Sequence, residues 1–184
     1  MMIQHVLAEA GIGGIDDELV SVDAGGAETA ADWDSLRSAE NYVGYERTEN
    51  FASPGDAVLN SPHVYDFPTR FSLNEWALAG EWTVGEQAIV LNAANGRIAY
   101  RFHARDLHLV MGRASRGTSV RFRVFLDGQA PGAAHGSDVD EQGNGTVTDQ
   151  RLYQLIRQPK PIADRHFEIE FLDAGVEAFV FTFG

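Results

Sequence analysis

Residues 97–126 read RIAYRFHARDLHLVMGRASRGTSVRFRVFL, and apolar and polar side chains alternate through most of this stretch. Ile98, Tyr100 and Phe102 fall on one face of its first part, while arginines and a histidine fall on the other face. A period of two residues is typical of a half-buried β-strand. The stretch therefore predicts strands over residues 97–104, 106–111 and 119–126.

Short alternating segments of the same kind continue from Tyr42 to the C-terminus, separated by turn residues such as Asn95-Gly96 and Asp127-Gly128. Strands this closely spaced favour a sandwich or a barrel. No alternation of strand and helix patterns is visible, which argues against a parallel sheet. We therefore predict one mainly β domain over residues 42–184, with further strands at 79–84, 87–92, 151–156, 165–172 and 176–183.

The N-terminal part of the sequence differs in periodicity and composition. Residues 1–10 carry apolar side chains at helical spacing, and Gly11 then ends the pattern, so we expect a short N-terminal helix. Its shortness indicates the remnant of the last helix of an upstream domain. Residues 11–41 are rich in glycine, alanine and acids and predict a linker or arm, with Trp33 and Leu36 as its anchors on the β domain.

Charge and cysteine content exclude several classes of function. The 184 residues include 27 acids and 14 Lys or Arg, a net charge of −13 that opposes nucleic acid and anionic membrane surfaces. No apolar run reaches the roughly 18 residues that a membrane-spanning helix needs. The chain has no cysteine, so it cannot itself perform thiol redox chemistry. We predict no nucleic-acid partner and no direct membrane insertion.

The polar faces of the predicted strands supply the candidate ligand-binding residues. If the strands are neighbours, one row brings together Arg101, His103, Arg121, Arg123, Tyr153, Glu168 and Glu170. This row fits either a solvated sheet face with cross-strand ion pairs or a platform for a hydroxyl-rich or carboxylated ligand. Trp76 is a further candidate, as a stacking surface for a sugar ring or as a core residue, whereas Trp82 is expected in the core.

Only weak signals for a metal site are present. Asp138, Asp140 and Asn144 resemble the start of a calcium loop, although Gln142 and Gly145 depart from that pattern. The alternative is an acidic turn rich in Asx and glycine. Calcium is therefore the one cofactor considered, and the sequence predicts no other.

Zinc and catalytic sites are not predicted. The histidines at 103, 108 and 135 have no zinc-ligand spacing. No serine has the context of a nucleophile elbow, and no phosphate-binding or dinucleotide fingerprint occurs. We therefore expect no catalytic residue in this chain.

Several long motifs support a resemblance to a known family. They are NEWALAGEWTV (74–84), GRIAYRFHARDLHLVMG (96–112), VRFRVFLDGQAPGAAHGSDVDEQGNGTV (120–147), RLYQLIRQP (151–159) and FEIEFLDAGVEAFVFTFG (167–184). In this order they resemble the C-terminal domain of DipZ-type thiol–disulfide interchange proteins, a domain that also follows the thioredoxin-like domain of related soluble proteins. The earlier IQHVLAEAG (3–11) resembles the final helix of that thioredoxin-like domain.

The resemblance implies an antiparallel jelly-roll β-sandwich, similar to carbohydrate-binding modules and galactose-binding-like domains. It also implies that the full-length protein is a thiol–disulfide oxidoreductase. We expect a non-catalytic accessory module that binds a saccharide or peptide on the polar row or beside the glycine-rich 128–148 loop. The alternative is a structural domain that docks on the upstream thioredoxin-like domain or mediates dimerisation. The resemblance implies an extracytoplasmic location if the domain is joined to a membrane-spanning DipZ-like protein, and a cytoplasmic one otherwise.

Overall fold

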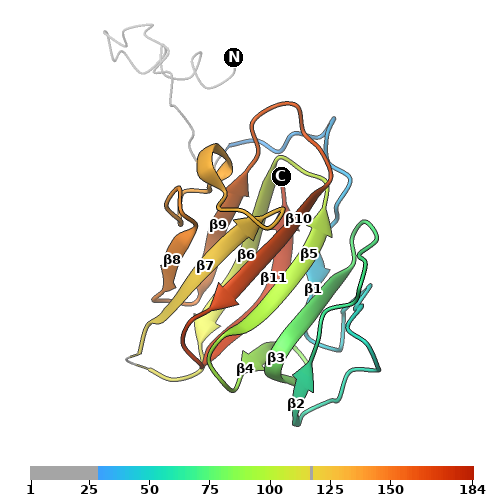
Figure 1. Cartoon of the computed structure of the whole chain (residues 1–184), viewed down its shortest axis with the longest axis vertical. Coiled ribbons are helices and arrows are strands. Elements are labelled where there is room, and N and C mark those ends of the chain that lie inside the picture. The colour runs from blue at the N-terminus through green and yellow to red at the C-terminus, as the bar shows by residue number, and fades with distance from the viewer. Residues whose placement is uncertain (1–28, 117) are drawn as a thin grey trace, which may run out of the picture.

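The computed structural model describes residues 29–116 and 118–184. The predicted helix over 1–10 and the linker residues up to 28 lie outside the described residues. The described part is mainly β and antiparallel, and its strands pair into one curled sheet (Figure 1). No helix in this part is long and apolar enough to cross a membrane.

The strands and the single short helix of the described residues follow in chain order. They are β1 (Asn41–Tyr42), β2 (Pro62–Tyr65), β3 (Trp76–Val84), β4 (Ile89–Leu91), β5 (Gly96–Phe102), β6 (Asp106–Arg113), β7 (Val120–Leu126), the 3-10 helix η2 (Gly132–Ala134), β8 (Asn144–Val147), β9 (Arg151–Arg157), β10 (Arg165–Phe171) and β11 (Val176–Phe183).

The sheet has two halves that share strand β3. The first half has the order β8-β7-β10-β5-β3, and the second continues as β3-β4-β11-β6-β9, with β2 on β3 and β1 on β11. Figure 1 shows β7, β10 and β5 in front of β6 and β11. Every strand pair is antiparallel.

Strand β3 passes from one half to the other at Gly80. Its residues up to Ala79 pair with β5, whereas those from Trp82 onward pair with β4. Gly80 has φ +95°, and a Cβ atom there would lie 2.9 Å from the Cα of Gly96. Only glycine combines this backbone conformation with so close an approach. Gly80 therefore allows β3 to pass from one half-sheet into the other.

The core lies between the two halves and is held by aromatic side chains from both. Trp82 of β3 meets Phe171 of β10 at a centroid distance of 5.9 Å, and Phe167 of β10 meets Phe181 of β11 at 6.1 Å. All four rings are fully buried, as the sequence predicted for Trp82. Burying one such side chain stabilises the fold by roughly 1.5–3 kcal/mol, so these contacts fix the two halves face to face.

All eight strands expected from the alternating pattern are present, each within a few residues of its predicted ends. The largest shift is in β3, which begins at Trp76 instead of residue 79. The missed strands are β1, β2 and β8, which have two or four residues each. They are too short to show a period, and β2 begins with a proline and β8 with Asn-Gly, which are turn signals.

Residues 29–37, here called the strap, belong to the segment predicted as a linker or arm, and they lie against the β domain. Leu36 packs against the core, but Trp33 is 76% exposed, so only Leu36 is an anchor. Arg105 donates a hydrogen bond from Nη2 to the carbonyl of Ala30 at 2.8 Å. The strap is therefore bound to the domain through both side-chain and backbone contacts.

A buried carboxylate orders the side chains beneath the strap. The Asp106 side chain is 3% exposed and accepts hydrogen bonds from Nε of Arg105 at 2.9 Å and Nε of Arg157 at 2.7 Å. Its backbone N–H donates to the carbonyl of Gly184 at 2.9 Å. Charge-assisted bonds of this kind are short and strong, so Asp106 joins the strap and the C-terminus of the domain.

Candidate functional site

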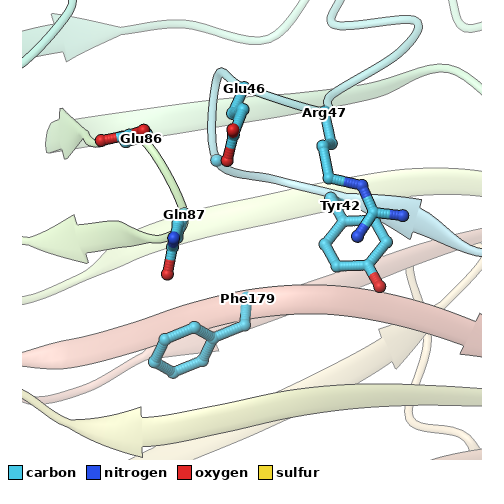
Figure 2. A pocket seen from close by; sticks show the side chains of 7 residues that line it. Tyr42, Glu46, Arg47, Glu86, Gln87 and Phe179 are labelled. Carbon is cyan, nitrogen blue, oxygen red and sulfur yellow. The ribbon is translucent and has the colours of Figure 1, made fainter.

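A cavity of about 300 Å³ opens where β11, the segment after β1 and the β3–β4 turn meet. It combines aromatic and hydrogen-bonding side chains, which Figure 2 shows around one shared space: Tyr42, Glu46, Arg47, Glu86, Gln87 and Phe179. Its volume is at the lower end for small-molecule sites. We call it the Tyr42–Phe179 pocket.

A β-bulge places the floor of this pocket. Ala178 pairs with Met111 and Val180 with Val110, so Phe179 is the extra residue of strand β11. Its carbonyl accepts a hydrogen bond from the N–H of Val43 at 3.0 Å. Bulges re-aim side chains, often beside functional sites. Here the bulge leaves the ring of Phe179 half-buried at the base of the cavity.

The segment from Asn41 to Glu49 forms one wall. The Asn41 amide closes this segment, because its Nδ2 donates to the Glu49 carbonyl at 3.0 Å and its Oδ1 accepts from the Glu49 N–H at 3.1 Å. The Arg47 guanidinium lies over the Tyr42 ring, with Cζ 3.6 Å from the ring centroid. This cation–π contact holds both side chains at the pocket.

The β3–β4 turn forms the opposite rim. Glu46 donates its N–H to the carbonyl of Glu86 at 3.1 Å. A Cβ atom on Gly44 would lie 2.4 Å from the carbonyl carbon of Gln87, so only glycine allows this approach. The side chains of Glu46, Glu86 and Gln87 are exposed, and none forms an ion pair or a side-chain hydrogen bond with the described residues. They are therefore available to a ligand.

The pocket lining combines groups that can stack with groups that can hydrogen-bond. The aromatic rings offer faces for stacking, the two carboxylates accept hydrogen bonds, the guanidinium donates them, and the amide does both. Together these groups can hold a ring-shaped ligand that carries several hydroxyl groups.

The polar row expected from the sequence lies on the outer face of the first half of the sheet. Strands β5, β10 and β7 are neighbours, and Glu170 lies opposite both Arg97 and Arg123 in their registers. Arg101 lies opposite His166. The structure thus brings together Arg101, His103, Arg121, Arg123, Glu168 and Glu170, and ligand binding there stays a prediction.

Most of these side chains are already paired with neighbouring residues outside this set. His103 Nδ1 lies 2.6 Å from Asp164, which also lies 3.7 Å from Arg101. Arg121 donates from Nε and Nη2 to Asp173 at 2.9 and 2.8 Å. These partners occupy the hydrogen-bonding groups that a ligand would need.

Two further groups of the row, Arg123 and Glu168, are paired as well. Arg123 donates to Asn144 at 3.0 Å. Glu168 contacts His166 at 3.1 Å and Arg97 at 3.4 Å, and these two partners, His166 first, hold the pKa of the Glu168 carboxyl below its usual range. The face therefore consists largely of satisfied cross-strand pairs.

A loop also covers part of the polar row. The ring of Phe67 lies 4.9 Å from the guanidinium of Arg97, and the ring of Phe71 lies 4.9 Å from that of His166. Ala99, which shares this face, is fully buried. The loop therefore covers the part of the outer face around Arg97 and His166.

Two candidate residues are buried: Tyr153, which was expected on the exposed polar row, and Trp76, for which a core position was the stated alternative. Tyr153 is on β9, in the other half of the sheet, and is fully buried. Its hydroxyl accepts hydrogen bonds from the N–H groups of Thr148 and Asp149 and donates one to the Asp149 carbonyl. Trp76 is 1% exposed and donates from Nε1 to the carbonyl of Glu49 at 3.0 Å. Both aromatic residues are structural.

The residues suggested for calcium are engaged with N–H donors. Asp138 accepts from Arg151 and from the backbone of Gln154 at 2.8 and 2.7 Å. Asp140 accepts from the N–H of Asn144 at 2.8 Å, and the Asn144 side-chain oxygen accepts from Arg123. This arrangement matches the alternative of an acidic Asx turn, and calcium binding stays a prediction.

The histidines named in the sequence have separate partners. His108 contacts Thr182 at 3.2 Å and His135 contacts the carbonyl of Gly132 at 2.8 Å. Burial lowers the pKa of His108. Across residues 29–116 and 118–184, no three His, Asp or Glu side chains are grouped to hold a metal.

Sequence patterns did not identify the Tyr42–Phe179 pocket, although one signal was present. In β11 the buried positions change from Val176 and Ala178 to Phe181, that is, from even to odd numbers. Such a shift of phase within a strand indicates a bulge. The rim residues come from a turn and a loop, whose approach depends on tertiary contacts.

A family model described as "Thioredoxin like C-terminal domain" matches residues 38–184. The chain is also similar to the proteins DipZ of Mycobacterium bovis and Mycobacterium tuberculosis, each 29% identical over 82 residues. These matches cover 45% of the chain and only 12% of each relative. The resemblance that the motifs indicated is confirmed, and the chain belongs to the family of thioredoxin-like C-terminal domains.

Proposed function

We propose that this domain is a non-catalytic accessory module of a thioredoxin-like thiol–disulfide interchange protein and that it binds a saccharide in the Tyr42–Phe179 pocket. The observation that carries the proposal is the pairing of an aromatic floor with a hydrogen-bonding rim. The C–H face of a sugar ring packs on an aromatic ring, while its hydroxyl groups bind carboxylate, amide and guanidinium groups. The accessory role is supported by the family.

The proposal assigns the redox chemistry to another part of a longer protein. The chain has no cysteine, so no thiolate can come from it. Two antiparallel half-sheets that face each other across one core, with β3 in both, support a jelly-roll sandwich of the galactose-binding-like kind.

The test is a titration of a monosaccharide panel followed by NMR of the backbone amides. We expect shifts at residues around Phe179 and Tyr42, and Phe179→Ala should weaken binding about tenfold because it removes the stacking surface. Arg121→Ala, on the polar row of the other half-sheet, is the matched control and should leave affinity unchanged. Loss of binding in Arg121→Ala but not in Phe179→Ala would place the site on the polar row instead.

A second candidate is a structural domain that docks on the upstream thioredoxin-like domain or mediates dimerisation. The strap favours it, because Arg105, itself bound to Asp106, holds Ala30 against the domain. Light scattering of this chain, and of a longer one that includes the thioredoxin-like domain, tests it. A monomeric chain whose two domains tumble independently would contradict it.

A further inference from the structure

We propose that the Tyr42–Phe179 pocket selects an amino sugar whose amine is positively charged over a neutral sugar or a sugar acid. The inference rests on the proposed function and deepens it by naming the charge of the ligand. The charges, the ring positions and the size of the pocket all favour such a ligand.

The rim of the pocket carries unneutralised negative charge. Glu46 and Glu86 are exposed and have no basic partner among the described residues. Asp106 and Asp173 differ in this respect, since each binds an arginine. A carboxylate that lies at a cavity without an ion-pair partner is free to bind a cation.

The one basic side chain of the pocket does not cancel this charge. Arg47 is held over the Tyr42 ring, on the wall away from Gln87. The lining residues thus carry two negative charges and one positive charge, within a chain of net charge −13. Both values favour a cation and oppose a carboxylate ligand, with a strength that depends on salt.

The aromatic residues favour the same ligand. The contact between Arg47 and Tyr42 shows that one ring of the pocket already accepts a cation on its face. Phe179 offers a second ring face at the floor, and Figure 2 shows the Glu46 side chain directed toward the pocket space that Tyr42 and Phe179 border. A cavity of about 300 Å³ suits one sugar ring. The ring can stack on Phe179 while an amine at its edge meets the carboxylate.

The experiment compares glucosamine, glucose and glucuronic acid by NMR titration at low salt, where charge interactions are least screened. We expect glucosamine to bind about three- to tenfold more tightly than glucose, and glucuronic acid to bind more weakly than glucose. Raising the salt concentration should bring glucosamine toward glucose.

Charge-neutral variants localise the effect. Glu46→Gln and Glu86→Gln should each lower the preference for glucosamine about two- to fivefold. The matched control is Glu141→Gln, which makes the same charge change at an exposed position in the loop after η2 and should leave the preference unchanged.

Each contrary result is distinguishable. Equal affinity for glucosamine and glucose, with both lost in Phe179→Ala, would overturn the amino-sugar inference and leave the proposed function standing. A preference that survives in the Glu46→Gln/Glu86→Gln double variant would also overturn it. If no sugar shifts any resonance of the folded protein, or if a lysine-containing peptide alone binds at these residues, both the inference and the proposed function are wrong.

Discussion

Asp173 shows how single charged residues of the outer face are held. It accepts hydrogen bonds from the Arg121 guanidinium and from the Arg121 backbone N–H, and these two contacts lower the pKa of its carboxyl from 3.8 to about 2. A carboxyl whose pKa is lower in the folded state contributes stability above the unfolded value. That contribution is lost as the pH falls through the folded value.

We therefore predict that Arg121→Ala returns the pKa of Asp173 toward 3.8 and weakens the pH dependence of stability between 3.8 and about 2. An NMR titration of the side-chain carboxyl measures this directly. Arg123→Ala is the control, because Arg123 binds Asn144 and not Asp173. An unchanged pKa of Asp173 in Arg121→Ala would show that the pair does not form in solution.

Tyr153 supports a second prediction at this scale, because its hydroxyl binds the backbone at Thr148 and Asp149. Tyr153→Phe should leave two N–H groups without their partner and lower the free energy of unfolding by about 1–3 kcal/mol. Chemical denaturation measures the loss. Tyr45→Phe is the control, since its hydroxyl only accepts an exposed bond from Asn60. A variant of normal stability that no longer binds sugar would restore Tyr153 as a ligand residue.

Among the elements, β3 has the greatest influence on the fold because it belongs to both half-sheets. Gly80→Ala would place a Cβ in a left-handed backbone conformation and 2.9 Å from the Cα of Gly96. We expect a loss of about 2–4 kcal/mol in the free energy of unfolding. Gly55→Ala is the matched control, with φ +84° and nothing within 4 Å, and should cost only about 1 kcal/mol. Equal losses in the two variants would show that the close approach in β3 is unimportant.

The strands also show how far the sequence predicts this structure. A strand with one buried and one exposed face must alternate apolar and polar side chains. This is why β5, β7 and β10 were predicted, together with their polar row. Alternation does not tell which face a loop covers, and it cannot show that Phe67 and Phe71 lie on that row. It also assigned Tyr153 to the wrong side, because Arg151 and Arg157 share its phase in β9. The Tyr42–Phe179 pocket depends on contacts between segments far apart in the chain, which no local pattern encodes.

At the scale of the whole molecule, the N-terminal boundary of the folded domain differs from the boundary of the family match. The family match begins at residue 38, yet the strap before it contributes Leu36 to the core and accepts the hydrogen bond from Arg105. The folded unit therefore extends beyond the family boundary on its N-terminal side.

We predict that a chain starting at Thr29 is more stable than one starting at Ser38 by about 2–3 kcal/mol, because the shorter chain lacks the Leu36 contact and the bond to Ala30. Thermal and chemical denaturation of the two chains measure the difference. Leu36→Ala in the longer chain is the control and should reproduce part of the loss, because it removes the same contact. Equal stability would show that the strap is not part of the folded unit.

The contact between the strap and Gly184 has one more consequence. Gly184 lies beside Ala31 and exchanges backbone hydrogen bonds with Asp106, so the first and last described residues of the domain lie close together. A module with neighbouring ends can be inserted into a surface loop of a host protein without separating the two sides of that loop. The same proximity makes circular permutation feasible, because a short peptide from Gly184 to Thr29 would join the two ends and change only the order in which the strands are synthesised.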